Sequence, residues 1–572
     1  MKVISRSSIA IGLFFLGIVS ANLVSHHVHP FRTFYNEFAI IFALLLSLVF
    51  AFSRGTYVIQ PRVVWGLFAL LLMMAFQLVT QMVWPHQVIF PAMYIVLAIL
   101  AVFFGAHLSR EEFTATNLCD AIAKAHVLVA LLSVGMECVQ IMGWDWRPLV
   151  MYMPTQGVAN VRPFANIAQP NQLALMLCFG LAGIWWLRQQ TKLKGMPAFL
   201  MCVVLVWGLA LTQSRIAWLI LPIFAGLSVS ALIGKKREPF SPILILLFLY
   251  VLLVFFLKEI SQWIGFSSGS VIERIGGRSE RSILAQQALS MIGSHPWLGV
   301  GWFGFGPAQV DIGAEFSPTI YAEHSHNLVL NIAAELGLPF AILFFGAMLI
   351  WVWRTCMNLS MRRRPETGLF LLFLIAAGIH SLVEFPLWYA FVLVPLMVLA
   401  GVVHGLRWKQ EASSIPATVI QRLAILGLLF SAFVVYDFQR VVEGFAEFRR
   451  AKDYASMNVE KVQRPSFTLM SDYYSYFSVM RILPAKNMTR DQIEFLEESS
   501  RRFGYVHVLS KLAEVYVLNG EEQKAIKTMR TLSKLHPYYY PEYYDYWQSL
   551  SARDQAYARV FATMPARDFA EQ

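Results

Sequence analysis

The stretch EHSHNLVLNIAAELG, residues 323–337, combines a histidine with polar side chains in an otherwise apolar run. His326 is followed by Asn327, Asn331 and Glu335, and the spacing of four residues places these three on one face of a helix. A neutral imidazole can accept a proton from a hydroxyl group at neutral pH, so His326 is a candidate general base. The alternative is structural: a polar ladder that packs helices together, with the histidine as its cap.

Arginine residues supply a second kind of chemistry. Arg215 lies in LTQSRIAWL, between two apolar runs with almost no loop, and Arg274, Arg278 and Arg281 cluster in a long polar segment. A guanidinium group binds phosphate through two hydrogen bonds and stays charged near lipid. We therefore expect Arg215, Arg278 and Arg281 to bind an anionic substrate in the membrane. For the clustered arginines, contact with solvent or lipid headgroups is the alternative.

A third group of polar residues lies in RPFANIAQPNQLA, residues 162–174. Arg162, Gln169 and Asn171 flank the expected start of a helix, where Pro170 suits the first turn. We expect these side chains to support the site. Helix capping and loop packing are the alternative roles.

His380 and Glu384 form a fourth group, in the stretch HSLVEFPLWY. They are four residues apart, on one face of an expected helix that Pro386 should end. Ionisable side chains inside a membrane are costly and are functional candidates by default. A structural hydrogen-bonded pair that holds a neighbouring helix is the other interpretation.

The sequence lacks several common motifs for binding metal ions and nucleotides. The chain has no Asp-x-Asp motif, no Walker-type glycine loop and no Cys-x-x-Cys motif. We therefore expect no metal site and no cofactor, and we expect arginine to interact with phosphate in place of a divalent ion.

The elements that position these residues are membrane helices. The chain has 572 residues, of which 57% are hydrophobic and 14% charged, whereas soluble domains are about 25% charged. Open sheets cannot satisfy their backbone in lipid, so we expect an all-α polytopic membrane protein. About 13 apolar runs have the length of a transmembrane helix. They lie near residues 8–24, 38–52, 63–83, 87–106, 119–141, 170–187, 196–212, 215–233, 242–257, 327–353, 368–387, 389–406 and 422–437.

The net charge of +11 is explained by the placement of the loops on the two sides of the membrane. Lysine and arginine gather in short loops on alternate sides of the apolar runs, which is the positive-inside pattern. We therefore expect no nucleic-acid partner, a cytoplasmic N-terminus and, from the odd number of helices, a C-terminus on the outer side of a bacterial inner membrane. Two long outer loops follow, near 142–169 and 258–326, and loops of that length are usually functional.

The pattern predicts two domains, a transmembrane catalytic domain at 1–437 and a small helical outer domain at 438–572. In the long loop we expect a helix over 282–292 and a glycine-rich turn at 295–306. The C-terminal part has the spacing of one tetratricopeptide repeat, with two helices around Asn519–Gly520. The matching residues are Ala513, Tyr516, Gly520, Ala525 and Pro537. A plain helical cap is the alternative.

Several of these segments resemble one known family. SHNLVLNIAAELGLPF (325–340), TQSRIAW (212–218) and RSILAQQALSMIGSHPWLGVGWFGF (281–305) resemble the signature segments of the O-antigen ligase and polymerase superfamily, in the same order. Residues 162–174 and HSLVEFPLWYAFVLVP (380–395) resemble its PglL branch, bacterial O-oligosaccharyltransferases that glycosylate pilins and other exported proteins. One departure is Ala285, where the family often has an aromatic residue.

The resemblance implies a glycosyltransferase C-type membrane fold and an inverting, metal-independent transfer. The donor would be a glycan on undecaprenyl pyrophosphate and the acceptor a Ser or Thr hydroxyl of an exported protein such as pilin. The essential histidine of the superfamily falls on His326, and its arginines fall on Arg215 and Arg281.

Other functions remain open at this stage. An O-antigen ligase would use a sugar of the lipid A core as acceptor, and a Wzy-type polymerase would use a second lipid-linked glycan. A transporter of lipid-linked glycans would show inverted repeats with matched broken helices, which we do not find in the sequence. A non-catalytic scaffold has only the repeat-like C-terminal part in its favour.

Overall fold

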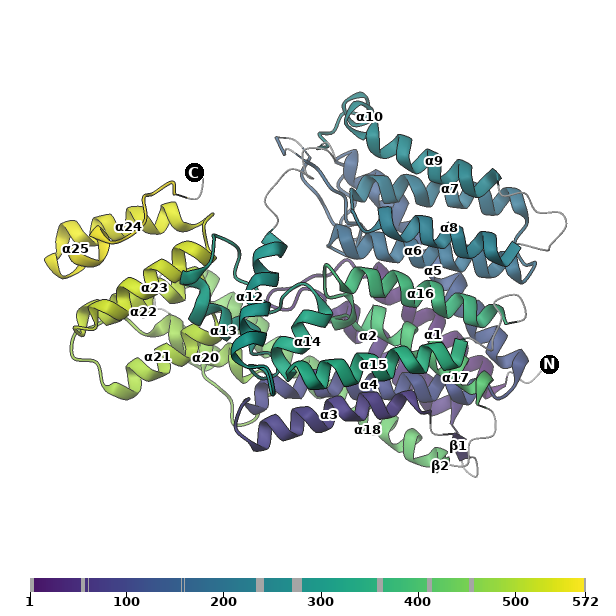
Figure 1. Ribbon diagram of the computed structural model, residues 1–572, viewed down its shortest axis with the longest axis horizontal. Helices are drawn as coiled ribbons and strands as arrows, with labels where there is room; N and C mark the ends of the chain where they lie inside the picture. Colours follow the sequence, from purple (N-terminus) through teal and green to yellow (C-terminus); the bar gives the residue numbers. More distant parts are fainter. Residues whose placement is uncertain are drawn as a thin grey trace. The chain divides into compact units, whose positions relative to one another are not determined.

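The computed structural model describes residues 5–52, 57–59, 61–155, 157–158, 160–232, 241–269, 280–356, 364–408, 414–451 and 457–569. Over these ranges the chain is mainly helical (Figure 1). Two three-residue strands, β1 (Tyr57–Ile59) and β2 (Ser414–Pro416), pair in antiparallel register with Tyr57 opposite Pro416. The helices form two compact units. The first comprises Met1–Leu70, Met93–Gly277 and Gly346–Phe433, and the second comprises Leu71–Ala92, Arg278–Phe345 and Val434–Gln572.

Among the described residues, nine helices are long and apolar enough to cross a membrane. They are α1 (Arg6–Leu23), α2 (Phe34–Ala51), α4 (Pro85–Leu108), α5 (Glu112–Ile141), α6 (Pro170–Gln189), α7 (Gly195–Thr212), α15 (Leu338–Cys356), α17 (Ala390–Arg407) and α18 (Ala417–Arg450). A tenth candidate is the pair α9 (Ser241–Phe255) and α10 (Leu257–Ile264), bent by 67°. Shorter apolar helices are α3 (Val63–Val79), α8 (Ala217–Leu232) and α16 (Pro365–Ser381). A helical multi-pass membrane protein is thus confirmed, whereas the full number of crossings stays a prediction.

Small residues bring helices of the first unit close together. A Cβ atom added at Gly105 in α4 would lie 2.0 Å from the carbonyl oxygen of Val398 in α17. Conversely, a Cβ atom added at Gly401 in α17 would lie 2.1 Å from the carbonyl oxygen of Val102 in α4. Glycine at such points lets two membrane helices approach backbone to backbone.

The second unit holds the larger part of the long loop, from residue 278 onward, and the C-terminal helices. This part of the loop contains α12 (Glu280–Ser294), α13 (Phe305–Ile312) and η1 (Gly313–Glu315), and α14 (Leu328–Leu336) follows it. Because α12 covers the predicted stretch 282–292, that prediction is confirmed. The C-terminal helices are α19 (Val459–Val462), α20 (Ser471–Arg481), α21 (Arg490–Arg502), α22 (Val506–Leu518), α23 (Glu522–Leu535), α24 (Tyr540–Arg553) and α25 (Gln555–Ala562).

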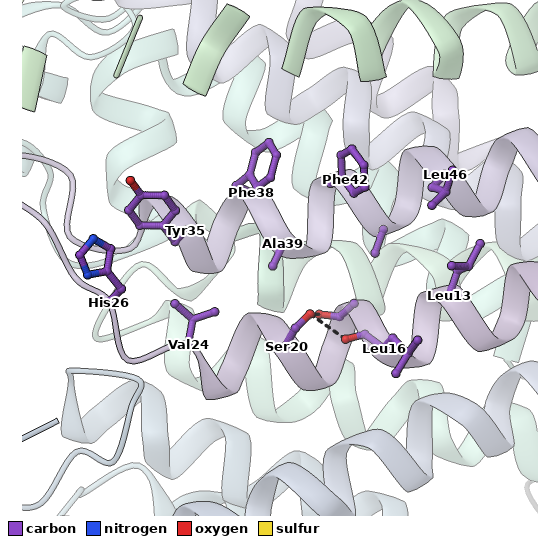
Figure 2. A pocket seen from close by; sticks show the side chains of 12 residues that line it. Leu13, Leu16, Ser20, Val24, His26, Tyr35, Phe38, Ala39, Phe42 and Leu46 are labelled. Carbon is purple, nitrogen blue, oxygen red and sulfur yellow. Dashed lines mark hydrogen bonds between the residues drawn. The ribbon is translucent and has the colours of Figure 1, made fainter. Parts of the chain in front are cut away.

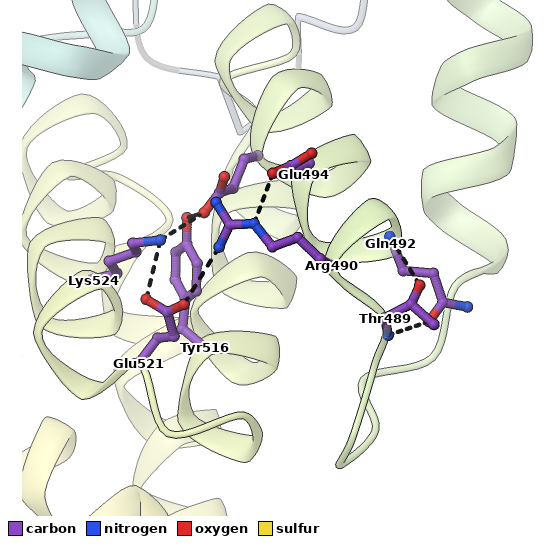
Figure 3. A network of polar contacts seen from close by, with 8 residues as sticks. Thr489, Arg490, Gln492, Glu494, Tyr516, Glu521 and Lys524 are labelled. Carbon is purple, nitrogen blue, oxygen red and sulfur yellow. Dashed lines mark hydrogen bonds and ion pairs between the residues drawn. The ribbon is translucent and has the colours of Figure 1, made fainter.

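The C-terminal helices have a core of their own, in which Trp547 and Tyr540 are fully buried. Two helices, α22 and α23, flank the Asn519–Gly520 turn as expected, and Gly520 has a φ of +80°. Thr489 begins α21 with a capping box, and a polar network joins α21 to α22 and α23 (Figure 3). The tetratricopeptide assignment stays a prediction, and the predicted domain boundary at 437/438 falls within α18.

Three local predictions need correction. The single helix expected over 327–353 is two helices, α14 and α15, separated at Gly337 with a φ of +87°. Only glycine fits there, because a Cβ atom would lie 2.2 Å from the carbonyl oxygen of Trp297. The outer loop expected from residue 258 begins with a helix, α10. Finally, α16 ends at Ser381, before Pro386, which instead begins the short helix η2 (Pro386–Trp388).

Candidate active site

His326 lies in a tightly bonded bend directly before α14. Its backbone has a φ of +54°, the left-handed conformation that few non-glycine residues adopt. On one side, the buried Ser325 donates its N–H to Asn331 Oδ1 at 2.9 Å and its hydroxyl to the Asn327 carbonyl at 2.9 Å. On the other side, Asn327 Oδ1 caps α14 by accepting from the N–H groups of Val329 and Leu330. The imidazole is half-buried, and its ring centroid is 4.6 Å from that of His324.

The polar ladder below His326 helps to build the bend. Asn331 and Glu335 are both buried in α14. Glu335 Oε1 accepts from the N–H of Phe305 at 3.4 Å, and its carboxylate also accepts from the N–H of Phe303 and from the Asn331 side chain. The structural interpretation is therefore partly correct, but a capping role for His326 is wrong because Asn327 is the cap. An asparagine oxygen takes this place because it can reach the first free N–H groups of the helix.

The glycine-rich turn at 295–306 packs against the end of α14. Gly299 and Gly301 have φ values of +70° and +96°, and the N–H groups of Val300 and Gly301 donate to the carbonyls of Ala334 and Glu335. A Cβ atom added at Gly299 would lie 2.3 Å from the Glu335 carbonyl carbon. The turn thus forms a fixed backbone support for the helix that follows His326.

Sequence reasoning missed Gln77, which is fully buried in α3. Its Nε2 donates to the carbonyls of Leu298 and Glu335 at 3.1 and 3.0 Å, and its Oε1 accepts from the N–H of Trp302 at 3.0 Å. Gln77 therefore joins the glycine-rich turn to the end of α14. The available signal was a lone amide side chain within an apolar run, which is costly in a membrane unless it is bonded.

Arg281 lies in the first turn of α12 and is half-buried. Leu284 and Ala288 follow on the same helix face, and both are buried in a cluster with Ala322 and Ala334. This face of α12 therefore packs toward α14 and the segment before His326, and Arg281 lies at its N-terminal edge. Arg278 and Arg274 lie outside the described residues.

In the first unit, three predicted side chains meet in one chain of hydrogen bonds. Arg162 donates through Nε to the carbonyl of Thr212 at 2.9 Å and through Nη2 to Asn171 Oδ1 at 3.0 Å. Asn171 Nδ2 in turn donates to Glu384 Oε1 at 3.1 Å. These bonds join the end of α7, the start of α6 and the turn after α16. Two segments that the sequence presents separately thus form one network.

Two other predicted residues lie beside this network. Gln169 caps α6, because its Oε1 accepts from the N–H of Gln172, so the capping interpretation is confirmed for this residue. His380 is fully buried in the last turn of α16, and its carbonyl accepts from the N–H of Glu384 at 2.9 Å. The Glu384 carboxylate therefore stands one turn beyond His380, where it bonds to α6 through Asn171.

Arg215 stands in the short turn between α7 and α8, and its side chain is exposed. The turn begins at Gln213, which has a φ of +50° and whose Nε2 donates to the carbonyl of Val161 and to Ser268 Oγ. Ser214 and Ile216 on either side of Arg215 are buried. The Arg215 carbonyl accepts from the N–H of Trp218 at 3.3 Å, whereas within the described ranges its guanidinium makes no hydrogen bond or ion pair.

An apolar groove runs between α1 and α2 (Figure 2). It has a volume of about 460 Å³, and Leu16, Phe38 and Phe42 are among the side chains that line it. One end carries His26 and Tyr35, whose ring centroids are 5.0 Å apart. A groove with apolar walls and polar groups at one end suits an amphipathic chain molecule.

Comparison with known proteins shows which families these segments resemble. A family model described as "O-Antigen ligase" matches residues 200–345, which hold Arg215, Arg281 and His326. A second, described as "Virulence factor membrane-bound polymerase, C-terminal", matches residues 367–554. The "General O-oligosaccharyltransferase" of Acinetobacter baylyi is 25% identical over 92% of this chain and 94% of its own length. The "ComP-specific O-oligosaccharyltransferase" of the same organism is 24% identical over 76% of this chain and 78% of its own length.

These similarities, together with the apolar helices, identify a membrane glycosyltransferase of the O-antigen ligase and polymerase superfamily. Within the superfamily, the chain belongs to the PglL-type branch of O-oligosaccharyltransferases, because both relatives of that description align along most of its length. The resemblance inferred from the sequence motifs is thereby confirmed.

Proposed function

We propose that this protein transfers a preassembled glycan en bloc from polyprenyl pyrophosphate to a Ser or Thr hydroxyl of an exported protein such as pilin. The observation that carries the proposal is the bend at His326, in which both neighbouring residues are bonded while the imidazole is half-buried. The names of the two Acinetobacter relatives favour a protein acceptor over a lipid A core sugar or a second glycan.

In the proposed reaction, the acceptor oxygen attacks the anomeric carbon and its proton passes to the His326 imidazole. The bond from that carbon to the pyrophosphate oxygen breaks, with inversion at carbon. Negative charge develops on the departing pyrophosphate, and Arg215 and Arg281 stabilise it in place of a metal ion. Supporting observations are the exposed guanidinium of Arg215 and the place of Arg281 at the edge of the α12 core.

The distribution of lysine and arginine among the loops predicts how the chain crosses the membrane. We propose that the chain crosses a bacterial inner membrane about 13 times, with its N-terminus in the cytoplasm and its C-terminal helices in the periplasm. The apolar groove between α1 and α2 would hold part of the polyprenyl chain, with its polar end toward the headgroup. The donor bond supplies the energy, so no nucleotide is needed.

A reconstituted assay tests the proposal. Purified protein is mixed with a lipid-linked oligosaccharide and a pilin, and the intact mass of the pilin is measured. A gain equal to one glycan supports the proposal. Glycan transfer to lipid A core, or elongation of the lipid-linked glycan without any pilin modification, would reassign the chain to one of the sister activities.

A further inference from the structure

The segment that leads to His326 is bonded to the C-terminal helices. The N–H groups of Thr319 and Tyr321 donate to the carbonyls of Lys534 and Leu535, at 2.8 and 3.0 Å. These two carbonyls belong to the last turn of α23, where helix carbonyls lack partners within the helix. The C-terminal helices therefore fix the backbone of this segment within seven residues of His326.

Side-chain packing strengthens this junction. The Tyr321 ring lies against Gly504, where an added Cβ atom would be 2.5 Å from the ring, so only glycine fits. The Tyr321 hydroxyl donates to the Arg502 carbonyl at 3.2 Å. On the other side of the segment, Gln309 accepts from the N–H of Ala322 at 2.8 Å and donates to the Ile320 carbonyl at 3.0 Å. The segment is thus held from two sides.

A charged cluster lies at the end of the junction nearest to His326. Arg502 Nη1 is 3.2 Å from Glu323 Oε1, and Arg502 Nε is 3.0 Å from Asp472 Oδ2. Asp472 Oδ1 is also 3.3 Å from His86 Nε2, in the first turn of α4. Glu323 precedes His326 by three residues. Arg502 therefore joins α21 and α20 to the segment that carries the candidate base.

The surroundings of Arg502 make these ion pairs stronger than surface pairs. The Arg502 side chain is 22% exposed, whereas that of its neighbour Arg501 is 57% exposed. Burial alone would lower the pKa of Arg502, but the charges of Glu323 and Asp472 outweigh this effect and raise the pKa above its ordinary value. A partly buried arginine shared by two carboxylates fixes geometry more firmly than a solvated pair.

We propose that Arg502 is a positioning residue for glycan transfer: by pairing with Glu323 and Asp472 it holds the segment 319–325, and so fixes the place of His326. The proposal rests on the proposed role of His326. The physical reason is that a reacting group displaced by about 1 Å can lose about a hundredfold in rate. The C-terminal helices are then part of the catalytic centre.

The test uses the full-length protein with Arg502→Gln, Glu323→Gln and the double variant. Arg501→Gln is the matched control, because Arg501 is the adjacent residue and pairs with Asp311 at an exposed site. We expect Arg502→Gln to lower kcat by roughly tenfold or more, with the KM for the lipid-linked donor changed less than about twofold. The double variant should be no worse than Arg502→Gln, because coupled partners are not additive. Arg501→Gln should keep wild-type kcat.

A second measurement does not depend on activity. Hydrogen–deuterium exchange of a peptide covering 319–327 should become faster in Arg502→Gln and stay unchanged in Arg501→Gln. If wild-type protein transfers no glycan, the proposed function fails, and the exchange result still decides whether Arg502 holds the segment. Unchanged exchange, or an unchanged kcat in a chain that does transfer glycan, overturns the positioning role.

Arg502→Lys covers the case in which the glutamine variant does not fold. Lysine keeps the charge but cannot reach both carboxylates with a planar fork. We expect normal amounts of folded protein with a lowered kcat. Wild-type kcat per folded molecule in this variant, or a loss of activity that only follows the loss of folded protein, would show that Arg502 is a structural residue.

Discussion

Replacing His326 by asparagine separates chemistry from backbone conformation. With its φ of +54°, this position disfavours most side chains by about 1 kcal/mol or more, whereas asparagine is enriched in this conformation. Ser325, Asn327 and Asn331 make bonds that hold the bend, and the substitution leaves these bonds in place. His326→Asn should therefore preserve the fold while removing the proton acceptor. A general base contributes ~10²–10⁴ in rate, or about 3–5 kcal/mol of activation free energy, so we expect kcat to fall by that factor.

The assay is single-turnover transfer from lipid-linked oligosaccharide to pilin, followed by intact mass and normalised to folded protein. Donor binding should be unchanged in His326→Asn. His324→Asn is the matched control, since it removes the neighbouring ring at 4.6 Å and should cost less than about tenfold. Turnover by His326→Asn within a few fold of wild type would refute the general-base role and leave His326 as an acceptor contact at most.

Four further predictions test other parts of the argument. Transfer should continue in EDTA, because arginines are proposed to stabilise the pyrophosphate; complete loss that magnesium or manganese restores would contradict this. Arg215→Lys should lower activity strongly in the same transfer assay, since lysine keeps the charge but cannot bind two phosphate oxygens in one plane. Wild-type turnover in this variant would show that Arg215 serves membrane topology and does not bind the donor. Gln77→Leu should lower the unfolding temperature of purified protein, because the buried Trp302 N–H and Leu298 carbonyl lose their bonds at about 1–3 kcal/mol each. The control Thr80→Ala, one residue beyond the end of the same helix, should change it little. Burial raises the pKa of Glu514 from 4.5 to about 7, so ionisation of this group destabilises the folded protein as pH rises through that interval. Glu514→Gln should therefore raise the unfolding temperature at pH 8 and not at pH 4, and an equal effect at both would disprove the charge argument.

Residues whose role depends on their spacing along one helix could be predicted from the sequence. His326, Asn331 and Glu335 were found because a helix repeats every three to four residues, and the structure places the latter two in α14. The helix α12 and the two helices around Asn519–Gly520 were predictable for the same reason. Local periodicity failed at Gly337, where a tertiary contact with the Trp297 carbonyl interrupts a continuous apolar run.

Which distant residues bond to one another could not be predicted in this way. Asn171 and Glu384 are 213 positions apart, and Arg502 and Glu323 are 179 positions apart. No local pattern links such pairs, because the fold brings them together and the spacing along the chain carries no information about it. Gln77 left only a weak signal, since one amide in an apolar helix does not identify its partner.

The bonding around His326 also limits which groups can contact a substrate. Asn327 is occupied as a helix cap, Asn331 bonds to Ser325, and Glu335 receives the N–H groups of the glycine-rich turn. Their polar groups are engaged in building the bend, so they suit support better than catalysis. His326 precedes the helix and carries the one imidazole of this ladder, on a half-buried side chain. Discrimination between acceptors must then depend on residues beyond the ladder, since a proton acceptor alone cannot distinguish a pilin hydroxyl from that of a sugar.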